Sequence, residues 1–297
     1  MSASPVEPRL PSSLDGGGTA SSSSSFTGRG ARQLFYRTWV PAPAKALVVL
    51  AHGLGEHSGR YEHVGQHLAR AGYAVWALDH CGHGRSDGTR VFVDRFDTFV
   101  EDLETFRALA VAAHPGLPTF LLGHSMGGAI ATAHAIDHPG CFAGMVLTGP
   151  ALQPSLRVSA LVVAVGKLVA KVCPKLGVVG LDGGKVSRDP AVVAAYRADP
   201  LVHHGKVTAG LGVQLLARAA RFPTEVAGLS LPVLIIHGQA DELVPIESSR
   251  NLVPRFGSPD LTFIEEPGLY HEVLNEPEQA RVLATIVSWM DERLAAR

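Results

Sequence analysis

Residues 123–128 read Gly-His-Ser-Met-Gly-Gly and place a serine in the spacing Gly-x-Ser-x-Gly. An apolar run, 119–122, precedes this motif, and an alanine-rich stretch that favours a helix, 129–136, follows it. A sharp turn between a strand and a helix exposes the serine hydroxyl and directs the first N–H groups of the helix toward a developing negative charge. The motif therefore predicts nucleophilic catalysis by Ser125.

A serine hydroxyl needs a base to take its proton, and that base follows the serine along chains with this motif. The sequence holds 14 histidines, so position must choose among them. His271 comes just after the last predicted strand, 261–265, and is the expected base. His124 is excluded as the base, because its side chain is expected to point away from the turn in a different direction from the side chain of Ser125.

The base in turn needs an acid that orients it, and the acid is expected after the penultimate strand. Asp241 stands in this place, after the apolar run 231–236, and is the expected acid. Its other interpretation is a helix cap ahead of Val244, and Glu242 is the less favoured candidate for the acid.

A negative charge on the substrate oxygen needs two backbone N–H donors, the oxyanion hole. One is expected from Met126, which follows the nucleophile, and the other from Leu54 in the turn His-Gly-Leu-Gly, 52–55. Alone, this turn would be an ordinary glycine-rich loop. His52, His80 and His83 are expected to order loops at strand ends.

Composition limits the chemistry further. The chain has 297 residues, 46% of them hydrophobic, and a net charge of -1, which gives no reason to expect a nucleic acid partner. Its three cysteines have no metal-like spacing and fit a reducing compartment. No dinucleotide fingerprint is present. We therefore expect neither a cofactor nor a metal.

The N-terminal residues 1–25 are rich in serine, glycine and proline and have no apolar core. They are predicted to be a disordered tail rather than a signal peptide. The longest apolar stretch elsewhere, 156–172, is interrupted by Arg157, Lys167 and Lys171, so no transmembrane segment is expected. A cytoplasmic protein, with peripheral membrane association as an option, is the resulting prediction.

The elements that must position these residues alternate along the chain. A hairpin of 25–27 and 32–40 is followed by apolar runs that end in glycine or polar turns: 46–51, 73–78, 118–122, 145–148, 231–236 and 261–265. Helical stretches are predicted at 61–71, 96–114, 125–138 and 277–296. This alternation predicts an α/β fold: a mostly parallel central sheet of about eight strands with helices on both faces. Its core would comprise residues 26–150 and 228–297.

The alternation lapses between residues 151 and 227, which are predicted to form an inserted helical cap. Helices are expected at 161–172, after Asp189-Pro190, and at 208–220. One face of the first helix is apolar, and it consists of Leu161, Val162, Val165, Leu168, Val169 and Val172. This face either packs onto the core or rests on lipid, and both can hold if the cap moves.

Several stretches together resemble the monoacylglycerol lipase family of α/β-hydrolases. They are His-Gly-Leu-Gly-Glu-His-Ser-Gly-Arg-Tyr at 52–61, Asp-His-Cys-Gly-His-Gly-Arg-Ser at 79–86, and residues 123–128, 238–245 and 267–272. The resemblance runs from about residue 26 to the C-terminus. The cap segment Asp-Pro-Leu-Val-His-His-Gly at 199–205 is most similar to bacterial, especially actinobacterial, members.

The resemblance implies hydrolysis of monoacylglycerol to glycerol and a fatty acid. It also implies that Glu56 and Arg60 hold the glycerol headgroup. From the residues alone, Glu56 could instead anchor its loop, and Arg60 could be a surface or helix-start charge. In mammalian members of this family a polar residue follows shortly after the base histidine, and residues 272–275 of this chain contain no clear match to it.

Other functions of the same residues stay open. The nearest is a broader lysophospholipase or carboxylesterase. A ligand receptor that kept the fold but turns over slowly, and perhydrolase chemistry, use the same residues.

Overall fold

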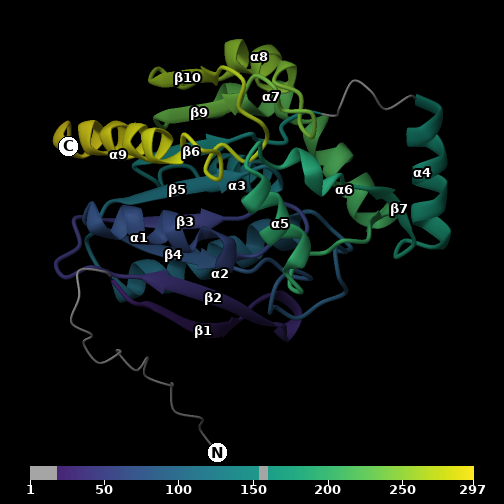
Figure 1. Ribbon diagram of the computed structural model, residues 1–297, viewed down its shortest axis with the longest axis horizontal. Helices are drawn as coiled ribbons and strands as arrows, with labels where there is room; N and C mark the ends of the chain where they lie inside the picture. The colour runs from purple at the N-terminus through teal and green to yellow at the C-terminus, as the bar shows by residue number, and fades with distance from the viewer. Residues whose placement is uncertain (1–18, 154–159) are drawn as a thin grey trace, which may run out of the picture.

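The central sheet is the scaffold of the site. The computed structural model describes residues 19–153 and 160–297. Eight strands lie in the order β1-β2-β4-β3-β5-β6-β9-β10 (Figure 1). Their bounds are Ser21–Thr27 (β1), Gln33–Trp39 (β2), Ala46–Ala51 (β3), Tyr73–Leu78 (β4), Thr119–His124 (β5), Gly144–Thr148 (β6), Val233–Gly238 (β9) and Leu261–Glu266 (β10). β2 pairs antiparallel with β1 and β4, and all other neighbours are parallel. The predicted fold class, sheet type and strand number are confirmed.

The inner strands are apolar along their whole length because both faces of the sheet are covered. β3, β4, β5, β6 and β9 are buried at every position. Alternate residues of a strand enter different cores: Leu47 and Val49 pack on one side of β3, and Val48 and Leu50 on the other.

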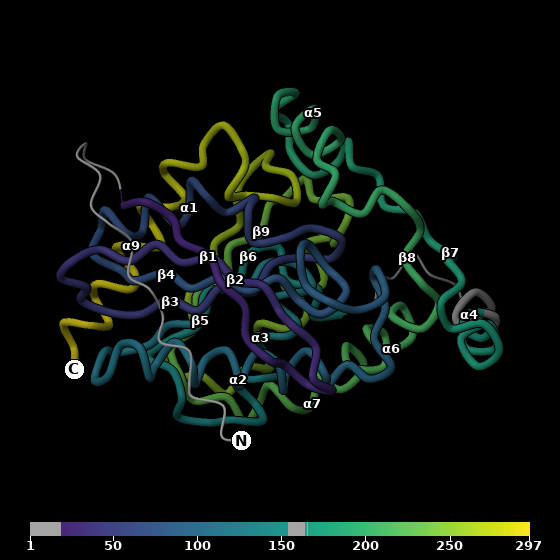
Figure 2. The backbone as a smooth tube through the Cα atoms, turned by 90° about the horizontal axis from the view of Figure 1, so that it is seen from below, coloured from purple at the N-terminus to yellow at the C-terminus, as the bar shows by residue number. Residues whose placement is uncertain are grey.

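Helices cover the two faces, as Figure 2 shows from the edge of the sheet. α1 (Glu62–Arg70) and α9 (Gln279–Ala295) lie together on one face, and α2 (Asp97–Ala113) and α3 (Met126–Asp137) on the other. A short helix that the sequence analysis did not predict, α8 (Glu247–Leu252), packs on the same side as α3. None of the described helices combines the length and the apolar character needed to cross a membrane.

The predicted tail ends earlier than residue 25. Residues 21–25 belong to β1, which pairs with β2 from Ser21 opposite Trp39 to Thr27 opposite Gln33. Backbone groups hold this strand in place, with an added hydrogen bond of 2.7 Å between Ser22 Oγ and Thr38 Oγ1. The prediction was wrong here because strand pairing needs backbone N–H and C=O groups, which a serine run has like any other. The rest of the predicted tail, 1–18, lies outside the described residues.

The segment between β6 and β9, called the inserted segment below (residues 160–227), lies beyond the carboxyl ends of the strands (Figure 1). It contains α4 (Ala160–Val172), β7 (Gly177–Gly180), α5 (Pro190–Ala198), β8 (Lys206–Thr208), α6 (Ala209–Ala219) and α7 (Phe222–Glu225). β7 and β8 pair antiparallel in a small sheet that the sequence analysis did not predict.

The apolar face expected on α4 is only partly covered. Leu168 is 64% exposed and Val172 is 75% exposed, while Val169 is half-buried. At these two positions the alternative of packing onto the core is wrong, since their side chains face outward. The side chains of residues 161, 162 and 165 are outside the described part of the chain.

Candidate active site

Ser125 occupies a strained turn between β5 and α3. Its backbone has φ 53° and ψ -116°, a conformation that is rare and costly for a residue with a side chain. Its N–H donates to Thr148 O at 3.0 Å, which holds the turn against β6. A Cβ at Gly127 would lie 2.1 Å from Ala51 O, so only glycine lets α3 begin so close to β3.

The structure brings the predicted nucleophile, base and acid together from loops after β5, β10 and β9. Ser125 Oγ lies 2.9 Å from His271 Nε2, and His271 Nδ1 lies 2.6 Å from Asp241 Oδ2. Since a carboxylate only accepts, Nδ1–H donates to Asp241 and Nε2 is left to accept the serine proton. In this arrangement the imidazole is oriented to act as a general base.

Asp241 also caps its own loop. Its Oδ1 accepts from Leu243 N at 2.9 Å and from Val244 N at 2.8 Å, while its Oδ2 faces His271. The helix-cap interpretation is wrong in detail, because the next helix, Glu247–Leu252, begins after Ile246 and Asp241 caps a turn of the loop before it. Glu242, the alternative acid, turns away to Lys185 Nζ at 2.9 Å and is about half exposed.

Sequence reasoning missed His237, a second partner of Asp241. His237 Nε2 lies 3.2 Å from Asp241 Oδ2, and Nδ1 lies 2.8 Å from Ser249 Oγ. The signal was its place four residues before Asp241 at the end of β9. This buried ring ties the acid loop to α8.

Mutual electrostatics set the pKa values of the base and the acid. Burial alone would lower the pKa of His271, but the charge of Asp241, its hydrogen bond and the charges of Glu272 and Glu56 together outweigh burial, and the pKa lies above its usual value. Burial would raise the pKa of Asp241, and the His271 charge with the hydrogen bonds from His237 and His271 lowers it overall. The pair therefore consists of a histidine with a raised pKa beside an aspartate with a lowered pKa.

His124 lies in the site without contacting the serine hydroxyl. Its ring centre is 4.8 Å from that of His271, but its Nδ1 points to Thr148 O at 3.0 Å. Burial lowers its pKa to about 4, so its ring is neutral beside the base. The expectation that His124 does not replace His271 fits this geometry.

The two N–H groups expected to form the oxyanion hole border the same pocket as Ser125. Leu54 and Met126 both line it, and within the described part of the chain neither N–H has a hydrogen-bond acceptor. A Cβ at Gly53 would lie 2.8 Å from Glu56 Oε1 and 3.3 Å from Ser125 Cβ. The loop can therefore approach the nucleophile only because Gly53 has no side chain.

His52 fixes this loop from behind. Its Nδ1 lies 2.7 Å from Gly53 O, and its Nε2 accepts from His80 N at 3.0 Å. Burial lowers the pKa of His52, as it does for His80, and lowers that of His83 to about 3. A neutral His52 can make both bonds at once, which agrees with a role in ordering the loop.

The pocket over Ser125 has a volume of about 410 Å³. The inserted segment contributes mainly apolar side chains to its wall, namely Leu181, Val186, Tyr196, Leu215, Leu216 and Ala219. Four acidic residues line it as well: Glu56 and Glu272, which both bond to Arg60, and Asp182 and Glu247. A largely apolar cavity with acidic groups at its wall suits a molecule with an apolar chain and a polar end.

Glu56 anchors its loop and reaches the pocket. Its Oε1 accepts from Gly53 N at 2.6 Å and from Tyr61 Oη at 2.7 Å, and its Oε2 from Arg60 at 2.7 Å. Burial would raise its pKa, but the charge of Arg60, the two histidines nearby and the hydrogen bond from Tyr61 together outweigh burial and lower the pKa to about 2. The loop-anchor interpretation of Glu56 therefore describes real contacts, and they leave room for a role toward a ligand.

Arg60 lies behind the carboxylates and not in the pocket wall. It forms a two-pronged ion pair with Glu272, both bonds 2.6 Å long, and its guanidinium stacks over the Tyr196 ring at 4.7 Å. The side chain is 9% exposed, so the surface-charge interpretation of Arg60 is wrong. Glu272, which the sequence analysis did not propose as a site residue, was signalled only by its place beside His271.

The loop that carries His271 also holds the inserted segment. Glu272 N donates to Val186 O at 2.8 Å, and Ser187 Oγ donates to Asn275 O at 3.0 Å. The fully buried carboxylate of Glu276 accepts from Arg188 Nε at 2.9 Å. Residues 186–188 are thus fastened to the base loop.

The sequence is similar to a known protein family and to characterised relatives. The family model described as serine aminopeptidase, S33, matches residues 42–278. The chain is 48% identical over 271 residues to a monoacylglycerol lipase of Mycolicibacterium smegmatis, which covers 91% of this chain and 97% of that protein. It is 38% identical to the human monoglyceride lipase over 267 residues, 88% of each chain.

A solved structure agrees in fold. The crystal structure of the Paleococcus ferrophilus monoacylglycerol lipase superposes with a TM-score of 0.78 at 34% sequence identity. The match covers 88% of this chain and 99% of that one. The match therefore extends over most of this chain and nearly all of the other.

Proposed function

The chain belongs to the monoacylglycerol lipase group of the serine aminopeptidase S33 family, and from this premise we propose that it hydrolyses monoacylglycerol to glycerol and a fatty acid. It is a carboxylic ester hydrolase with the α/β-hydrolase fold. The observation that carries the proposal is the chain of contacts from Ser125 through His271 to Asp241 at the floor of an apolar pocket.

The proposed reaction begins with attack of Ser125 Oγ on the ester carbonyl carbon while His271 Nε2 takes the serine proton. Asp241 stabilises the imidazolium that forms. The N–H groups of Leu54 and Met126 hold the oxyanion, each contributing on the order of 3 kcal/mol. Glycerol leaves with the proton from His271, and a water molecule deprotonated by His271 then releases the fatty acid from the serine.

The charges at the acidic region of the pocket support an uncharged headgroup. Two carboxylates, Glu56 and Glu272, line this region, and the one guanidinium between them belongs to Arg60. Together, Glu56, Glu272 and Arg60 therefore carry a net negative charge, which does not attract anions. The carboxylate oxygens can accept hydrogen bonds from hydroxyl groups. We infer that glycerol binds here through Glu56, with Arg60 holding the carboxylates in place. A phosphate-bearing lysophospholipid would be repelled.

The inserted segment is proposed to act as a cap that holds the acyl chain. Its apolar residues supply most of one wall of the pocket. We propose the domain division that the sequence predicts: a cap of residues 151–227, which includes the inserted segment, between the core parts 26–150 and 228–297.

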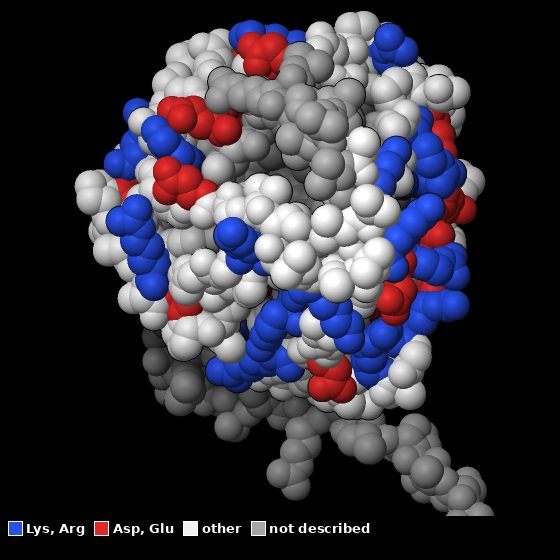
Figure 3. Space-filling view, turned by 90° about the vertical axis from the view of Figure 1, so that its right-hand side faces the viewer, with Lys and Arg blue, Asp and Glu red and all other residues white. Residues whose placement is uncertain are grey.

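We also propose that the outer side of this cap makes transient contact with lipid. Leu168, Val172, Leu176 and Val179 are exposed there, and residues 160–181 include three lysines and no acidic residue. Figure 3 faces this side: uncharged residues occupy its centre, and Lys and Arg side chains gather below and to the right. Apolar side chains beside lysines suit the interface of a membrane with anionic lipids.

The test is a comparison of turnover on monoacylglycerol between the parent chain and Ser125→Ala. We expect loss of nearly all activity with an unchanged fold, because no other hydroxyl touches His271 Nε2 in the described structure. Ser248→Ala is the matched control, since this buried serine lines the same pocket. Full activity of Ser125→Ala would refute the proposal.

A substrate panel separates the alternatives. Preference for monoacylglycerol over lysophosphatidate and lysophosphatidylcholine supports the proposed headgroup, and activity on lysophospholipids alone favours the lysophospholipase. Observation of many turnovers per protein molecule would exclude the alternative of a ligand receptor that turns over slowly.

A further inference from the structure

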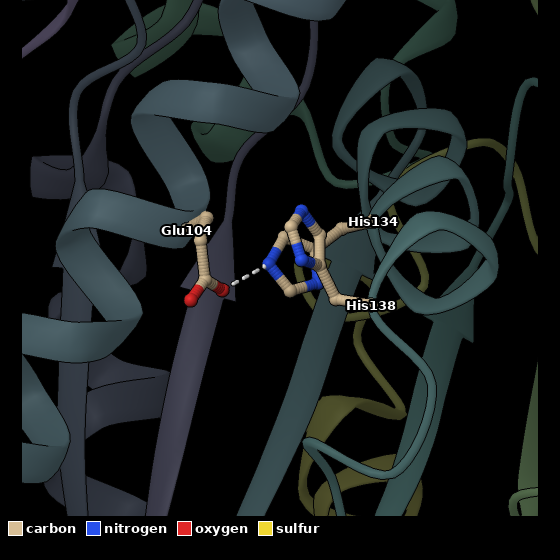
Figure 4. Close-up of side chains that lie close together, drawn as sticks. All are labelled: Glu104, His134 and His138. Carbon is tan, nitrogen blue, oxygen red and sulfur yellow. Dashed lines mark hydrogen bonds and ion pairs between the residues drawn. The ribbon is translucent and has the colours of Figure 1, made fainter.

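Three side chains that the proposed reaction does not use meet between α2 and α3. Glu104 projects from α2 toward His134, in the last turn of α3, and toward His138, which follows that helix (Figure 4). One donor atom from each lies within 4.8 Å of the other two. His134 Nε2 lies 2.8 Å from Glu104 Oε2, and the two imidazole ring centres are 4.6 Å apart.

His134 is not fully satisfied by these contacts. Its side chain has no exposed surface, and its Nδ1 is buried with no hydrogen-bond partner in the described residues. A buried polar atom without a partner costs free energy and asks for an explanation.

Glu104 is held as a carboxylate by its neighbour. Arg107 Nε and Nη2 donate to its two oxygens at 2.7 Å and 2.6 Å. Such a second partner orients a carboxylate in the way that supporting groups orient metal ligands.

We propose that Glu104, His134 and His138 form a binding site for a divalent transition metal ion, with Zn²⁺ as the ion that the donors suit best. His138 follows His134 by four residues at the end of α3, the two rings lie side by side, and two imidazoles with one carboxylate are a common zinc donor set. Glu104 and His138 are only partly buried, so water can complete the coordination. Metal bonds of about 2.0–2.2 Å need a modest rotation of the rings.

This site is structural rather than catalytic. Ser125 and His138 flank the 12 residues of helix α3, so they lie about 20 Å apart along it. An ion there would join α2 to the far end of the helix whose beginning lines the active site. The sequence analysis expected no metal, because it searched for cysteine spacings and did not weigh the His-x-x-x-His at the end of α3.

The test is a titration of the untagged, full-length chain with Zn²⁺ alone. Every protein compared carries Cys141→Ser and Cys173→Ser, since these two thiols are not fully buried and could bind zinc themselves. We expect about one ion per chain by calorimetry and a higher melting temperature with zinc than with a chelator. The melting temperature reports binding independently of activity.

The variants identify the donors. His138→Ala and Glu104→Gln each should weaken zinc binding at least about tenfold and remove the rise in melting temperature. His67→Ala is the matched control: it removes one member of the pair His63 and His67, also four residues apart on a helix and partly buried. Absence of stoichiometric binding, or equal affinity in His138→Ala and the parent, would mean that the trio is only a hydrogen-bonded contact between two helices.

Discussion

At the scale of single residues, the candidate site is held by groups that each serve two contacts. Asp241 caps its loop with one oxygen and faces His271 with the other. Glu56 fixes Gly53 and Arg60 and still borders the pocket. Because these donors and acceptors are already held in place, they do not have to reorganise during the reaction. Such preorganised groups stabilise the charge that develops on a substrate in a buried site.

The pH dependence of kcat/KM should report His271. Its pKa is raised above 6.5 by Asp241, and only the neutral ring accepts the serine proton, so kcat/KM should fall as the pH drops below that raised pKa. In Asp241→Asn the raising charge is gone, so the acid limb should move to lower pH while the maximal rate drops about 10⁴-fold. A pH–rate profile of both proteins measures this.

Glu242→Gln is the control for that experiment, because it removes a neighbouring carboxylate that bonds only to Lys185. An unshifted acid limb in Asp241→Asn, or an equal shift in Glu242→Gln, would contradict the assignment of the acid.

At the scale of elements, the sequence predicted most of the scaffold. Apolar runs buried on both faces and turns rich in glycine located the six parallel strands and the four main helices, because burial and turn chemistry are local signals. The motif Gly-x-Ser-x-Gly predicted Ser125, and the places of Asp241 and His271 followed from the order of the strands along the chain. The hairpin predicted for 25–27 and 32–40 located the end of β1, but residues 21–24 of this strand were missed, since serines carry no apolar pattern and the pairing with β2 depends on the backbone.

The ion pair of Arg60 with Glu272 also escaped prediction. It joins residues 212 apart in the sequence, and no local pattern reports which charges will meet after folding. The same holds for Glu104 with His134, which come together only because α2 and α3 share one face of the sheet.

The exposed side chains of α4 lead to a test of lipid contact. Leu168→Ser with Val172→Ser removes two outward apolar side chains, and partition onto vesicles of phosphatidylcholine and phosphatidylglycerol should fall about tenfold. Turnover of a short, water-soluble ester should stay the same, because neither residue lines the pocket. Cosedimentation with vesicles measures the change.

Leu109→Ser on α2 is the matched control, as Leu109 is a 37% exposed apolar residue outside the inserted segment. Equal loss of partition in the control, or none in the double variant, would exclude α4 as the contact.

At the scale of the whole molecule, the inserted segment is held unequally. Residues 186–188 bond to the loop of His271, whereas α4 lies at the outer edge of the molecule (Figure 2). The proposed cap is therefore anchored on the side of the base and open on the side that would face lipid.

Glu276→Ala tests this anchor. The carboxylate is fully buried and accepts from Tyr270 N, Arg188 N and Arg188 Nε, so its loss removes three hydrogen bonds and leaves a buried space. We expect the free energy of unfolding to fall by about 3 kcal/mol. Thermal and urea unfolding measure it, and Glu278→Ala, at a more exposed partner of Arg188, should cost far less. Equal costs would mean that Glu276 is no special anchor.

The unequal attachment of the inserted segment also bears on how this molecule can diverge. Substitutions along α4 change a surface and leave every bond of His271 as it is, whereas substitutions at 186–188 disturb the base loop directly. Substitutions that change the outer surface of α4 can thus accumulate while the contacts between Ser125, His271 and Asp241 stay the same. The fold therefore separates α4, whose surface can vary, from residues 186–188 and the loop of His271, where substitutions disturb the site.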